Sequence, residues 1–497
     1  MRTESKHVGS YLPTELTPSE DNVIMTGVEA PQKISATAPR SHLHFARTWL
    51  AILFGLFVFY AATFLRYRSY DIDNPWFLSF SYNTCVEHIY HDAFMNVRFP
   101  AGMDGTFLFG KLAAYVQFAA LGKLGWQQWP AMLLSSSFVL FSLGIWGLLL
   151  RRLGYTSAYV NLFLVAVGFS EPFVSAAEKF RYEPFSFGLL SIGLLLISYE
   201  WVAVGVFLGA LAVEIQPIAC VGLIPILVFT FWTRKFSLAL VFRFMGALLI
   251  AGCLYFVLHP SIMNIRDYLS NGQMVRGASR GGMLAAYFVQ RPRHLPELVC
   301  FLIAGPIYWR TRRTVQSNHL AISCLAMALV SVFIPHGNAS YMIFIYPFLV
   351  SVALSAYRVE LRAGLALALV LLYAIPQYVV WAYLNGDRGY RTEDIRQVSG
   401  TIATVSKQLG ISDDAVKIYG DYGLWFAHPH LYEAATRNTV QDADRADLYL
   451  CYERSIQIEA FSPTDVFYCP DLKRLVPLRL IATVTVHGNE LYLYTKR

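Results

Sequence analysis

The chain alternates between long apolar segments and short polar joints from residue 46 to residue 384. Several segments approach or exceed the roughly 20 apolar residues that cross a bilayer core. The pattern therefore predicts an all-α polytopic membrane protein with about eleven transmembrane helices. The predicted spans are 46–65, 129–150, 156–173, 185–198, 200–214, 216–233, 240–259, 296–310, 318–334, 340–357 and 363–384.

The charges of the joints predict the orientation of these spans. Four joints carry groups of Arg and Lys, at 151–152, 234–235, 310–313 and 358–362. Short loops rich in these residues remain in the cytoplasm. All four are cytoplasmic only if the apolar stretch 106–121 lies along the outer surface instead of crossing the bilayer. We therefore expect an interfacial helix there, an N-terminus inside and a C-terminus outside.

The composition agrees with a membrane protein. Hydrophobic residues make up 56% of the 497 residues and charged residues only 15%, a balance that would give a soluble protein large exposed apolar patches. The formal net charge of +7 lies largely beside apolar segments, so it indicates orientation and no nucleic-acid partner.

Residues 1–45 are polar and predict a disordered cytoplasmic tail. The predicted membrane domain, 46–384, has two long outer loops, 66–128 with interfacial helices and 260–295 rich in Arg.

Residues 385–497 have the composition of a small α/β domain, which the predicted topology places outside the cytoplasm. Apolar residues recur at helical spacing from Ile395 to Leu409, and Gly410 is a stop signal. Strands are expected at 416–419 and 447–452, and a hairpin from 483–486 and 491–494. If the domain is extracytoplasmic, Cys451 and Cys469 could form a disulfide there.

Ionisable residues gather at the predicted outer ends of the spans. Such residues at the edge of a membrane span are costly and usually functional. The simpler interpretations are also open, because an Asp before Asn-Pro is ordinary turn chemistry and Arg181 and Glu183 could only pair with each other. The ionisable candidates in chain order are Asp71, Asp73, Lys179, Arg181, Glu183, Glu214 and His336, and the polar Gln216 stands two residues after Glu214.

Two further groups lie in the outer loops. Arg276 and Arg280 stand among glycines in the second loop, where they could bind an anion or touch lipid headgroups. His88 and His91 are three residues apart in the first loop, a spacing that would bring two imidazoles together as metal ligands. An interfacial helix with titratable residues facing water explains the histidines equally well.

The order of these motifs resembles the GT-C superfamily of membrane glycosyltransferases, especially the group of protein O-mannosyltransferases and lipid A aminoarabinose transferases. The family has an acidic motif after the first span, a helix on the membrane surface and short polar motifs at later span ends. Two departures exist: Asp73-Asn74 replaces an Asp-Glu pair, so the second acid is missing unless Asp71 substitutes, and the surface helix lacks a Lys-Pro-Pro start. The matching segments are 70–77, 100–111, 181–184, 216–217 and 341–347.

The resemblance implies an enzyme that moves a sugar from a polyprenyl-phosphate donor to a hydroxyl acceptor (protein, lipid or glycan) at the outer face, with inversion. Asp73 would be the general base, and Asp71 would orient it or the acceptor. The implied phosphate-binding residues are Lys179, Arg181, His336, Arg276 and Arg280, and the implied substrate-binding residues are Glu183, Glu214, Gln216, Lys111 and Tyr341. A divalent ion on Asp71, Asp73, His88 and His91 is compatible with the sequence, but nothing requires a cofactor.

The expected partners are the lipid-linked donor, the acceptor and the bilayer itself. A bacterial inner membrane, with the site facing the periplasm, is the expected location, and the endoplasmic reticulum is the alternative.

A flippase or transporter of lipid-linked glycans and an O-antigen polymerase or ligase are the competing functions. The absence of an internal repeat and the polar residues at span ends disfavour a transporter, and the acid directly after the first span disfavours the polymerase class.

Overall fold

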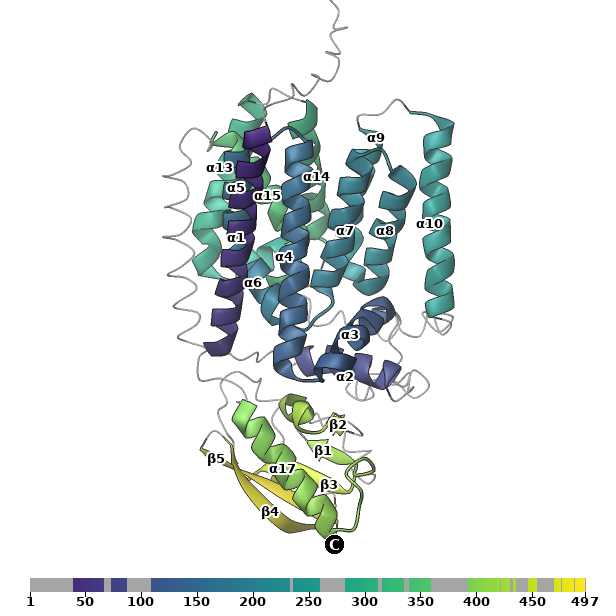
Figure 1. The fold of residues 1–497 in the computed structure, drawn as a ribbon, viewed down its shortest axis with the longest axis vertical. Helices are drawn as coiled ribbons and strands as arrows, with labels where there is room; N and C mark the ends of the chain where they lie inside the picture. The colour runs from purple at the N-terminus through teal and green to yellow at the C-terminus, as the bar shows by residue number, and fades with distance from the viewer. Residues whose placement is uncertain are drawn as a thin grey trace, which may run out of the picture. The chain divides into compact units, whose positions relative to one another are not determined.

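The fold is described by a computed structural model that is mostly helical and carries one five-stranded sheet near the C-terminus (Figure 1). The described residues are 39–66, 73–86, 109–232, 236–259, 282–311, 315–334, 339–358, 392–420, 422–429, 432–434, 446–453, 469–474, 476–486 and 488–496. The side chains of 39–45, 63–66, 73–74, 311, 315–317, 339, 422, 432–434 and 471 are outside that description. Residues 1–38 of the predicted tail and the predicted span 363–384 therefore lie outside the described residues, whereas residues 39–45 belong to a helix and not to a disordered tail.

The helices of the membrane domain agree with most of the predicted spans. They are α1 (Pro39–Arg66), α2 (Asp73–Cys85), α3 (Lys111–Leu124), α4 (Gln128–Arg152), α5 (Ser157–Gly168), α6 (Glu171–Glu178), α7 (Glu183–Ser198), α8 (Val202–Ile215), α9 (Leu223–Phe231), α10 (Leu238–Leu258), α12 (Gly282–Phe288), α13 (Leu295–Thr311), α14 (Val315–Ser331) and α15 (Tyr346–Ala356). Short 3-10 helices precede several of them: η1 (Pro217–Gly222), η3 (Pro292–His294) and η4 (Ala339–Phe344).

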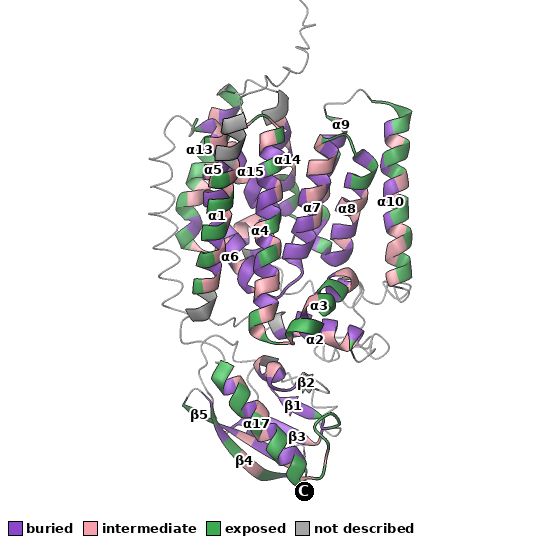
Figure 2. Ribbon diagram, in the orientation of Figure 1, coloured by how far each residue is buried: buried purple, intermediate pink, exposed green. Residues whose placement is uncertain are grey.

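Burial divides these helices into central and peripheral ones (Figure 2). Most residues of α7 are buried, whereas α10 exposes large apolar residues such as Phe242 and Leu249. An apolar face of that kind is compatible with lipid and not with water. By length and composition, α4 and α10 can cross a membrane, and α5 with α6 makes a third if the bent pair is one span. The number of eleven crossings stays a prediction.

Two predicted spans are broken where the sequence analysis expected one helix. The span 156–173 is α5 and α6, bent by 60° at their junction, and 340–357 is η4 followed by α15. Prolines explain both breaks, because Pro172 and Pro347 lack the N–H that would continue the hydrogen bonding of a preceding helix. The span 216–233 is continuous, since η1 runs directly into α9.

Residues 111–121 of the predicted surface segment 106–121 belong to α3, whose 14 residues are too few to cross a bilayer core. Figure 1 shows α2 and α3 lying across one end of α4, and we call this the α2–α3 end. Gly110 begins α3 with a left-handed backbone, at φ 83°. A Cβ at Gly110 would approach the Tyr182 ring to 2.2 Å, so only glycine fits beside the loop before α7.

The C-terminal domain confirms the predicted helix, strands and hairpin. Helix α17 (Thr392–Gln408) is followed by Gly410 in a left-handed conformation, and β4 (Leu478–Val486) forms a hairpin with β5 (Asn489–Lys496). The remaining elements are β1 (Ile418–Gly420), η6 (Tyr422–Ala427), β2 (Tyr432–Ala434), β3 (Leu448–Tyr452) and α18 (Cys469–Lys473). The strand order is β2-β1-β3-β5-β4, and β1 pairs in parallel with both neighbours. Cys451 and Cys469 form a disulfide.

The turn η6 joins the core of this domain to the α2–α3 end. The Trp425 side chain is 1% exposed and meets Tyr82 of α2 edge to face. Beside it, Phe426 packs against Phe180, which lies just before Arg181. Leu78 of α2, Leu121 of α3, and Ala131 and Met132 of α4 belong to the same hydrophobic core as residues of the sheet. The C-terminal domain therefore supports the segments that carry the candidate residues.

Trp425→Ala should destabilise the C-terminal domain by about 3–5 kcal/mol, because it empties a large, fully buried volume. The measurement is the temperature at which trypsin begins to cleave within residues 392–496 of the full chain. Leu480→Ala, at a side chain 49% exposed on β4 of the same domain, is the matched control. Equal cleavage temperatures for the two variants would contradict the packing described for η6.

Candidate active site at the α2–α3 end

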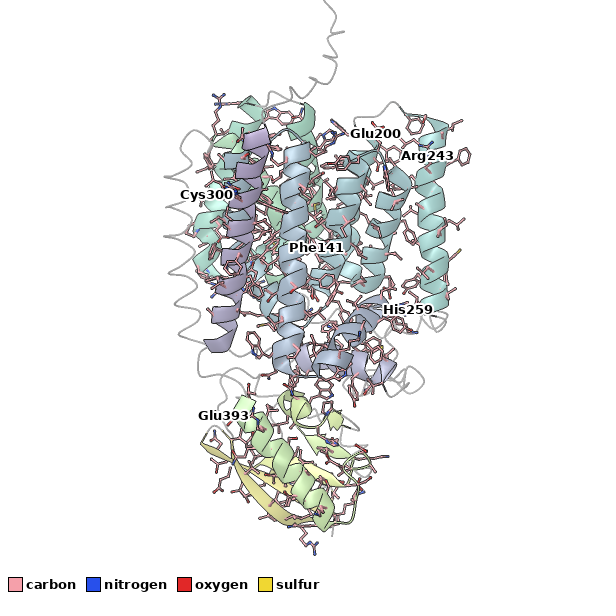
Figure 3. The ribbon with its side chains drawn as sticks, viewed as in Figure 1. Phe141, Glu200, Arg243, His259, Cys300 and Glu393 are labelled. Carbon is pink, nitrogen blue, oxygen red and sulfur yellow. A yellow bond between two sulfur atoms is a disulfide. The ribbon has the colours of Figure 1, made fainter. Side chains whose placement is uncertain are left out.

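The described candidate residues converge on one end of the bundle. Arg181 lies in the loop between α6 and α7, Gln216 directly follows α8, and Tyr341 lies in η4. Figure 3 shows His259 at the α2–α3 end, with Glu200 and Arg243 at the opposite end. Segments far apart in the sequence thus bring polar groups together as the sequence analysis expected.

Arg181 is the centre of the first polar cluster. Its side chain is 3% exposed, and its Nε donates to Glu183 Oε1 at 2.8 Å. Its Nη2 donates to the Tyr341 hydroxyl at 2.7 Å. The guanidinium carbon lies 5.1 Å from the ring centroids of both Phe77 and Tyr341. Charge, hydrogen bonds and two aromatic faces therefore fix this buried cation in place.

Glu183 is the buried anion of the same cluster. It begins α7, where the helix dipole favours a negative charge, and Pro184 follows in the first turn. Gln216 Nε2 donates to the same Oε1 at 3.2 Å. Within the described residues, Glu183 Oε2 has no hydrogen-bond partner although it is buried. Arg181 and Glu183 therefore form the expected ion pair, and Gln216 extends it to the end of α8.

The position of Asp73 follows from α2, which begins at this residue. Its side chain lies outside the described residues, but its backbone is one turn before Phe77. The Phe77 ring stacks on the Arg181 guanidinium. The backbone of α2 therefore begins at Asp73, one turn before the residue that contacts Arg181.

A chain of hydrogen bonds fixes α2 against α3 and the loop before α7. Ser81 Oγ lies 2.6 Å from Gln117 Oε1 and 3.0 Å from the Tyr182 hydroxyl. Gln117 Nε2 donates to the Phe180 carbonyl oxygen at 2.9 Å, and the Tyr182 hydroxyl donates to the Phe77 carbonyl oxygen at 3.2 Å. These buried polar groups explain why a polar Gln stands in the apolar helix α3.

Glu214 is the centre of a second cluster at the end of α8. Its Oε1 accepts a hydrogen bond from the backbone N–H of Lys111 at 3.0 Å and lies 2.8 Å from His259 Nε2. The Lys111 ammonium donates to the Leu258 carbonyl oxygen. Burial lowers the pKa of Lys111, and the Glu214 carboxylate opposes that shift. His259 was not among the predicted site residues.

Glu171 is the centre of a third cluster, which the sequence analysis did not anticipate. Its carboxylate accepts from Arg291 Nη1 and from Arg293 Nη2, each at 2.7 Å. His294 Nε2 lies 2.7 Å from Oε2, and the ring stacks on Tyr287 with centroids 4.2 Å apart. Two arginines of the predicted Arg-rich loop therefore bind a carboxylate of α6.

Several predicted site residues lie outside the described residues. These are Asp71, His88, His91, Arg276, Arg280 and His336. Lys179 ends α6 as its C-cap, two residues from Arg181 in the same loop. Among the residues that the structure does describe, no group of three or more His, Cys, Asp or Glu side chains could hold a metal ion.

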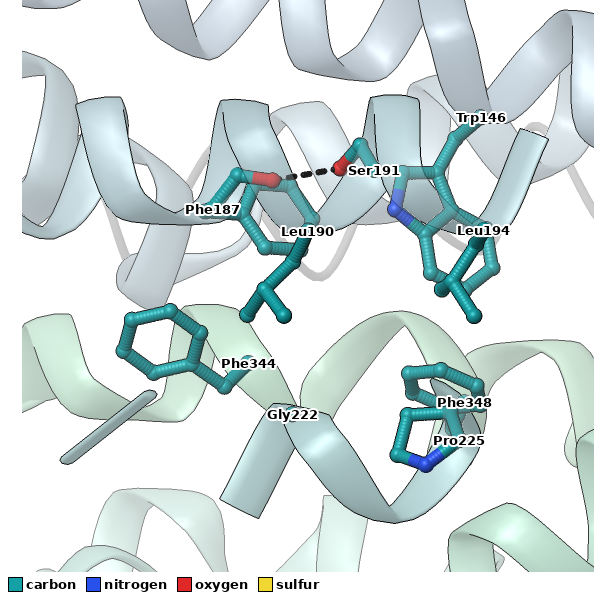
Figure 4. A pocket seen from close by; sticks show the side chains of 9 residues that line it. All are labelled: Trp146, Phe187, Leu190, Ser191, Leu194, Gly222, Pro225, Phe344 and Phe348. Carbon is teal, nitrogen blue, oxygen red and sulfur yellow. Dashed lines mark hydrogen bonds between the residues drawn. The ribbon is translucent and has the colours of Figure 1, made fainter. Parts of the chain in front are cut away.

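A small cavity inside the bundle is a different feature. It is lined by aromatic and aliphatic side chains from α4, α7, α9, η4 and α15, with Ser191 its hydroxyl-bearing residue (Figure 4). Ser191 Oγ donates to the Phe187 carbonyl oxygen of its own helix at 2.7 Å. An apolar lining without a titratable group offers no acid–base chemistry. The candidate site therefore remains at the α2–α3 end.

Comparison with solved structures identifies the class of fold. The chain is similar to the crystal structure of ArnT from Cupriavidus metallidurans bound to undecaprenyl phosphate, with a TM-score of 0.56 and 14% sequence identity. The match covers 91% of this chain and 97% of that chain. The fold is thus GT-C-like, which confirms the resemblance found in the sequence. No protein-family model matches the sequence, and no curated protein matches it either.

Glu183→Ala should lower the free energy of unfolding by about 3–5 kcal/mol, because it leaves the buried Arg181 charge without its carboxylate. The double variant Arg181→Met/Glu183→Leu removes both charges and should unfold at a higher temperature than Glu183→Ala. Thermal unfolding in detergent measures both variants. A Glu183→Ala protein as stable as the parent would contradict the pairing.

His294 makes the third cluster sensitive to pH. Burial alone lowers the pKa of His294, but hydrogen bonds to Glu171 and Glu297 outweigh it, so the pKa lies above its ordinary value of about 6.5. A group whose pKa is raised on folding contributes its full stabilisation at pH values below its unfolded-state pKa. This stabilisation is lost as the pH rises through the folded-state pKa. The melting temperature should therefore fall above about pH 6.5. Glu171→Gln should flatten this dependence, and an equally steep fall in that variant would contradict the assignment.

Proposed function

We propose that the protein is a membrane glycosyltransferase that uses a polyprenyl-phosphate sugar as donor and a hydroxyl group as acceptor. The observation that carries the proposal is the buried Arg181 cluster, formed beside the start of α2 in a GT-C-like fold. The similar ArnT structure was bound to undecaprenyl phosphate. A cation held at a fixed position at the end of a membrane bundle is suited to a lipid-linked phosphate.

The proposed reaction is a direct displacement. Asp73 takes the proton of the acceptor hydroxyl, whose oxygen attacks the anomeric carbon while the bond from that carbon to the phosphate oxygen breaks. Polyprenyl phosphate leaves with the bonding electrons, and the anomeric centre is inverted. Asp71 orients Asp73 or the acceptor.

Cations would stabilise the phosphate that develops negative charge as it leaves. Arg181 is the preorganised member, because Glu183, Tyr341 and Phe77 fix its position. Lys179 lies in the same loop, and His336 with Arg276 or Arg280 completes the proposed phosphate site. Glu183, Glu214, Gln216, Lys111 and Tyr341 would shape the substrate site. His88 and His91 would hold a divalent ion if one binds.

The proposed location is a bacterial inner membrane with the α2–α3 end in the periplasm, or an endoplasmic reticulum membrane with that end in the lumen. The chain would cross the bilayer about eleven times. The Cys451–Cys469 disulfide supports this orientation, because disulfides persist in oxidising compartments. A flippase or a glycan polymerase remains a competing function, and the GT-C-like fold favours the transferase over both.

Asp73→Asn should lower transfer from a radiolabelled polyprenyl-phosphate sugar by a factor of about 100 or more, the scale of losing a general base. The measurement is release of free polyprenyl phosphate by the purified protein in nanodiscs. Arg181→Ala should lower kcat or raise the donor KM by a factor of about 100, the scale of losing one preorganised donor.

Arg243→Ala, at an exposed residue of the opposite end, is the control and should transfer like the parent. Sugar transfer by Asp73→Asn at the rate of the parent would show that Asp73 is not the general base. Lipid movement across the bilayer that persists in this variant, without release of polyprenyl phosphate from the parent, would identify a flippase instead.

Impermeant maleimide should label Lys407→Cys from outside the cell, because α17 belongs to the proposed extracytoplasmic domain. Glu200→Cys, in the turn between α7 and α8, should react only after permeabilisation. The five cysteines other than Cys451 and Cys469 are first replaced by serine. The reverse labelling pattern would show that the orientation is inverted.

A further inference from the structure

His259 occupies an unusual place in α10. That helix presents most of its apolar surface outward, with only 22% of its most hydrophobic window buried. The residue directly after it, His259, is nevertheless 0% exposed, and its ring lies 4.8 Å from the Tyr255 ring one turn earlier. A fully buried imidazole is retained when its polar atoms have partners.

The partner of His259 is the carboxylate that also holds the start of α3. Glu214 Oε1 lies 2.8 Å from His259 Nε2, so Nε2 carries the proton when it bonds to the carboxylate. The same Oε1 accepts from the Lys111 backbone N–H at 3.0 Å. The Gly110 N–H donates to the Glu214 main-chain oxygen at 2.7 Å. The first turn of α3 is thus fixed to the end of α8.

The end of α10 reaches the same turn a second time. The Lys111 ammonium donates to the carbonyl oxygen of Leu258, the residue before His259. The titratable groups around the imidazole on these three elements are therefore Glu214 of α8, Lys111 of α3 and Tyr255 of α10. The end of α10 therefore restrains the start of α3 in two ways. Leu258 accepts a hydrogen bond from Lys111 directly, and His259 acts through Glu214.

Helix α3 passes this restraint to the candidate site. Gln117, nearly two turns after Lys111, binds the Phe180 carbonyl oxygen and Ser81 of α2. Phe180 precedes Arg181, and α2 carries Asp73 at its start. A shift of the first turn of α3 would therefore move Lys111 and loosen the contacts that fix α2 and the loop before α7.

We propose that His259 is a positioning residue of the site, acting through Glu214 on the first turn of α3. The consequence for catalysis rests on the proposed function, whereas the anchoring of α3 does not. His259 holds the Glu214 carboxylate on the Lys111 N–H, and so fixes Lys111 where a donor phosphate or sugar would bind. It need not touch the substrate itself.

The test uses the full chain in nanodiscs with three variants. His259→Ala removes the bond to Glu214, and His259→Gln keeps an N–H donor of similar reach. His319→Ala is the matched control, because His319 is also buried, at 4% exposure, but lies on α14. Hydrogen exchange of residues 111–117 and the donor KM and kcat are measured for each variant.

In His259→Ala, exchange of residues 111–117 should be faster by at least about tenfold, the scale of losing one hydrogen bond to a charged group. The donor KM should rise about tenfold with a smaller change in kcat, as expected when binding is weakened more than the chemical step. His259→Gln should restore both quantities to within about threefold of the parent, and His319→Ala should change neither.

A hydrogen-exchange rate of residues 111–117 that is unchanged in His259→Ala would contradict the proposal that His259 holds the first turn of α3. Faster exchange with an unchanged KM and kcat would overturn the positioning role. A parent protein that transfers no sugar would overturn the proposed function, and the exchange rates would still decide whether His259 holds α3.

Discussion

The structure of the site depends on the burial of one charge, the guanidinium of Arg181. A buried cation is costly unless an anion and hydrogen-bond acceptors replace its water. Glu183 supplies the anion, Tyr341 an acceptor, and Phe77 a second aromatic face. Because these partners come from α2, α7 and η4, satisfying Arg181 requires three separate parts of the chain to meet. The same requirement brings the start of α2, and with it Asp73, to this end of the bundle.

Carboxylates organise the neighbouring segments in the same way. Glu214 holds the start of α3 and the end of α10, and Glu171 holds Arg291, Arg293 and His294. These two anchors fix the described segments on both sides of residues 260–281. In each case the acid is paired with a histidine, His259 with Glu214 and His294 with Glu171.

Much of the fold could be predicted from the sequence, because hydrophobic periodicity and charge are local signals. The short helix α3, the hairpin of β4 and β5, and the order of the helices all follow from them. The break between α5 and α6 was missed since the predicted span 156–173 was continued across the polar Ser170-Glu171-Pro172 step. The parallel pairing of β1 with β2 was missed because short strands carry little periodic signal.

The candidate site was predicted in part for the same reason. Arg181, Glu183 and Gln216 stand in polar joints, where they are visible against apolar neighbours. His259 and Glu171 were missed because each is a single polar residue at the end of a helix, and its importance depends on a partner distant in the chain. Glu214 lies 45 residues from His259, and Glu171 lies 123 residues from His294. The His259-Pro260 step at the end of the predicted span 240–259 was the one local signal available.

The central claim is that Asp73 and Arg181 face one pocket that receives a lipid-linked phosphate. A cryo-electron microscopy map of the protein in nanodiscs with polyprenyl phosphate tests it most directly. The account predicts the phosphate within hydrogen-bond distance of Arg181, and the Asp73 carboxylate within about 10 Å of the guanidinium, roughly a Debye length at an ionic strength of about 0.1 M. A phosphate bound elsewhere, or a separation of Asp73 and Arg181 above about 15 Å, would contradict the account.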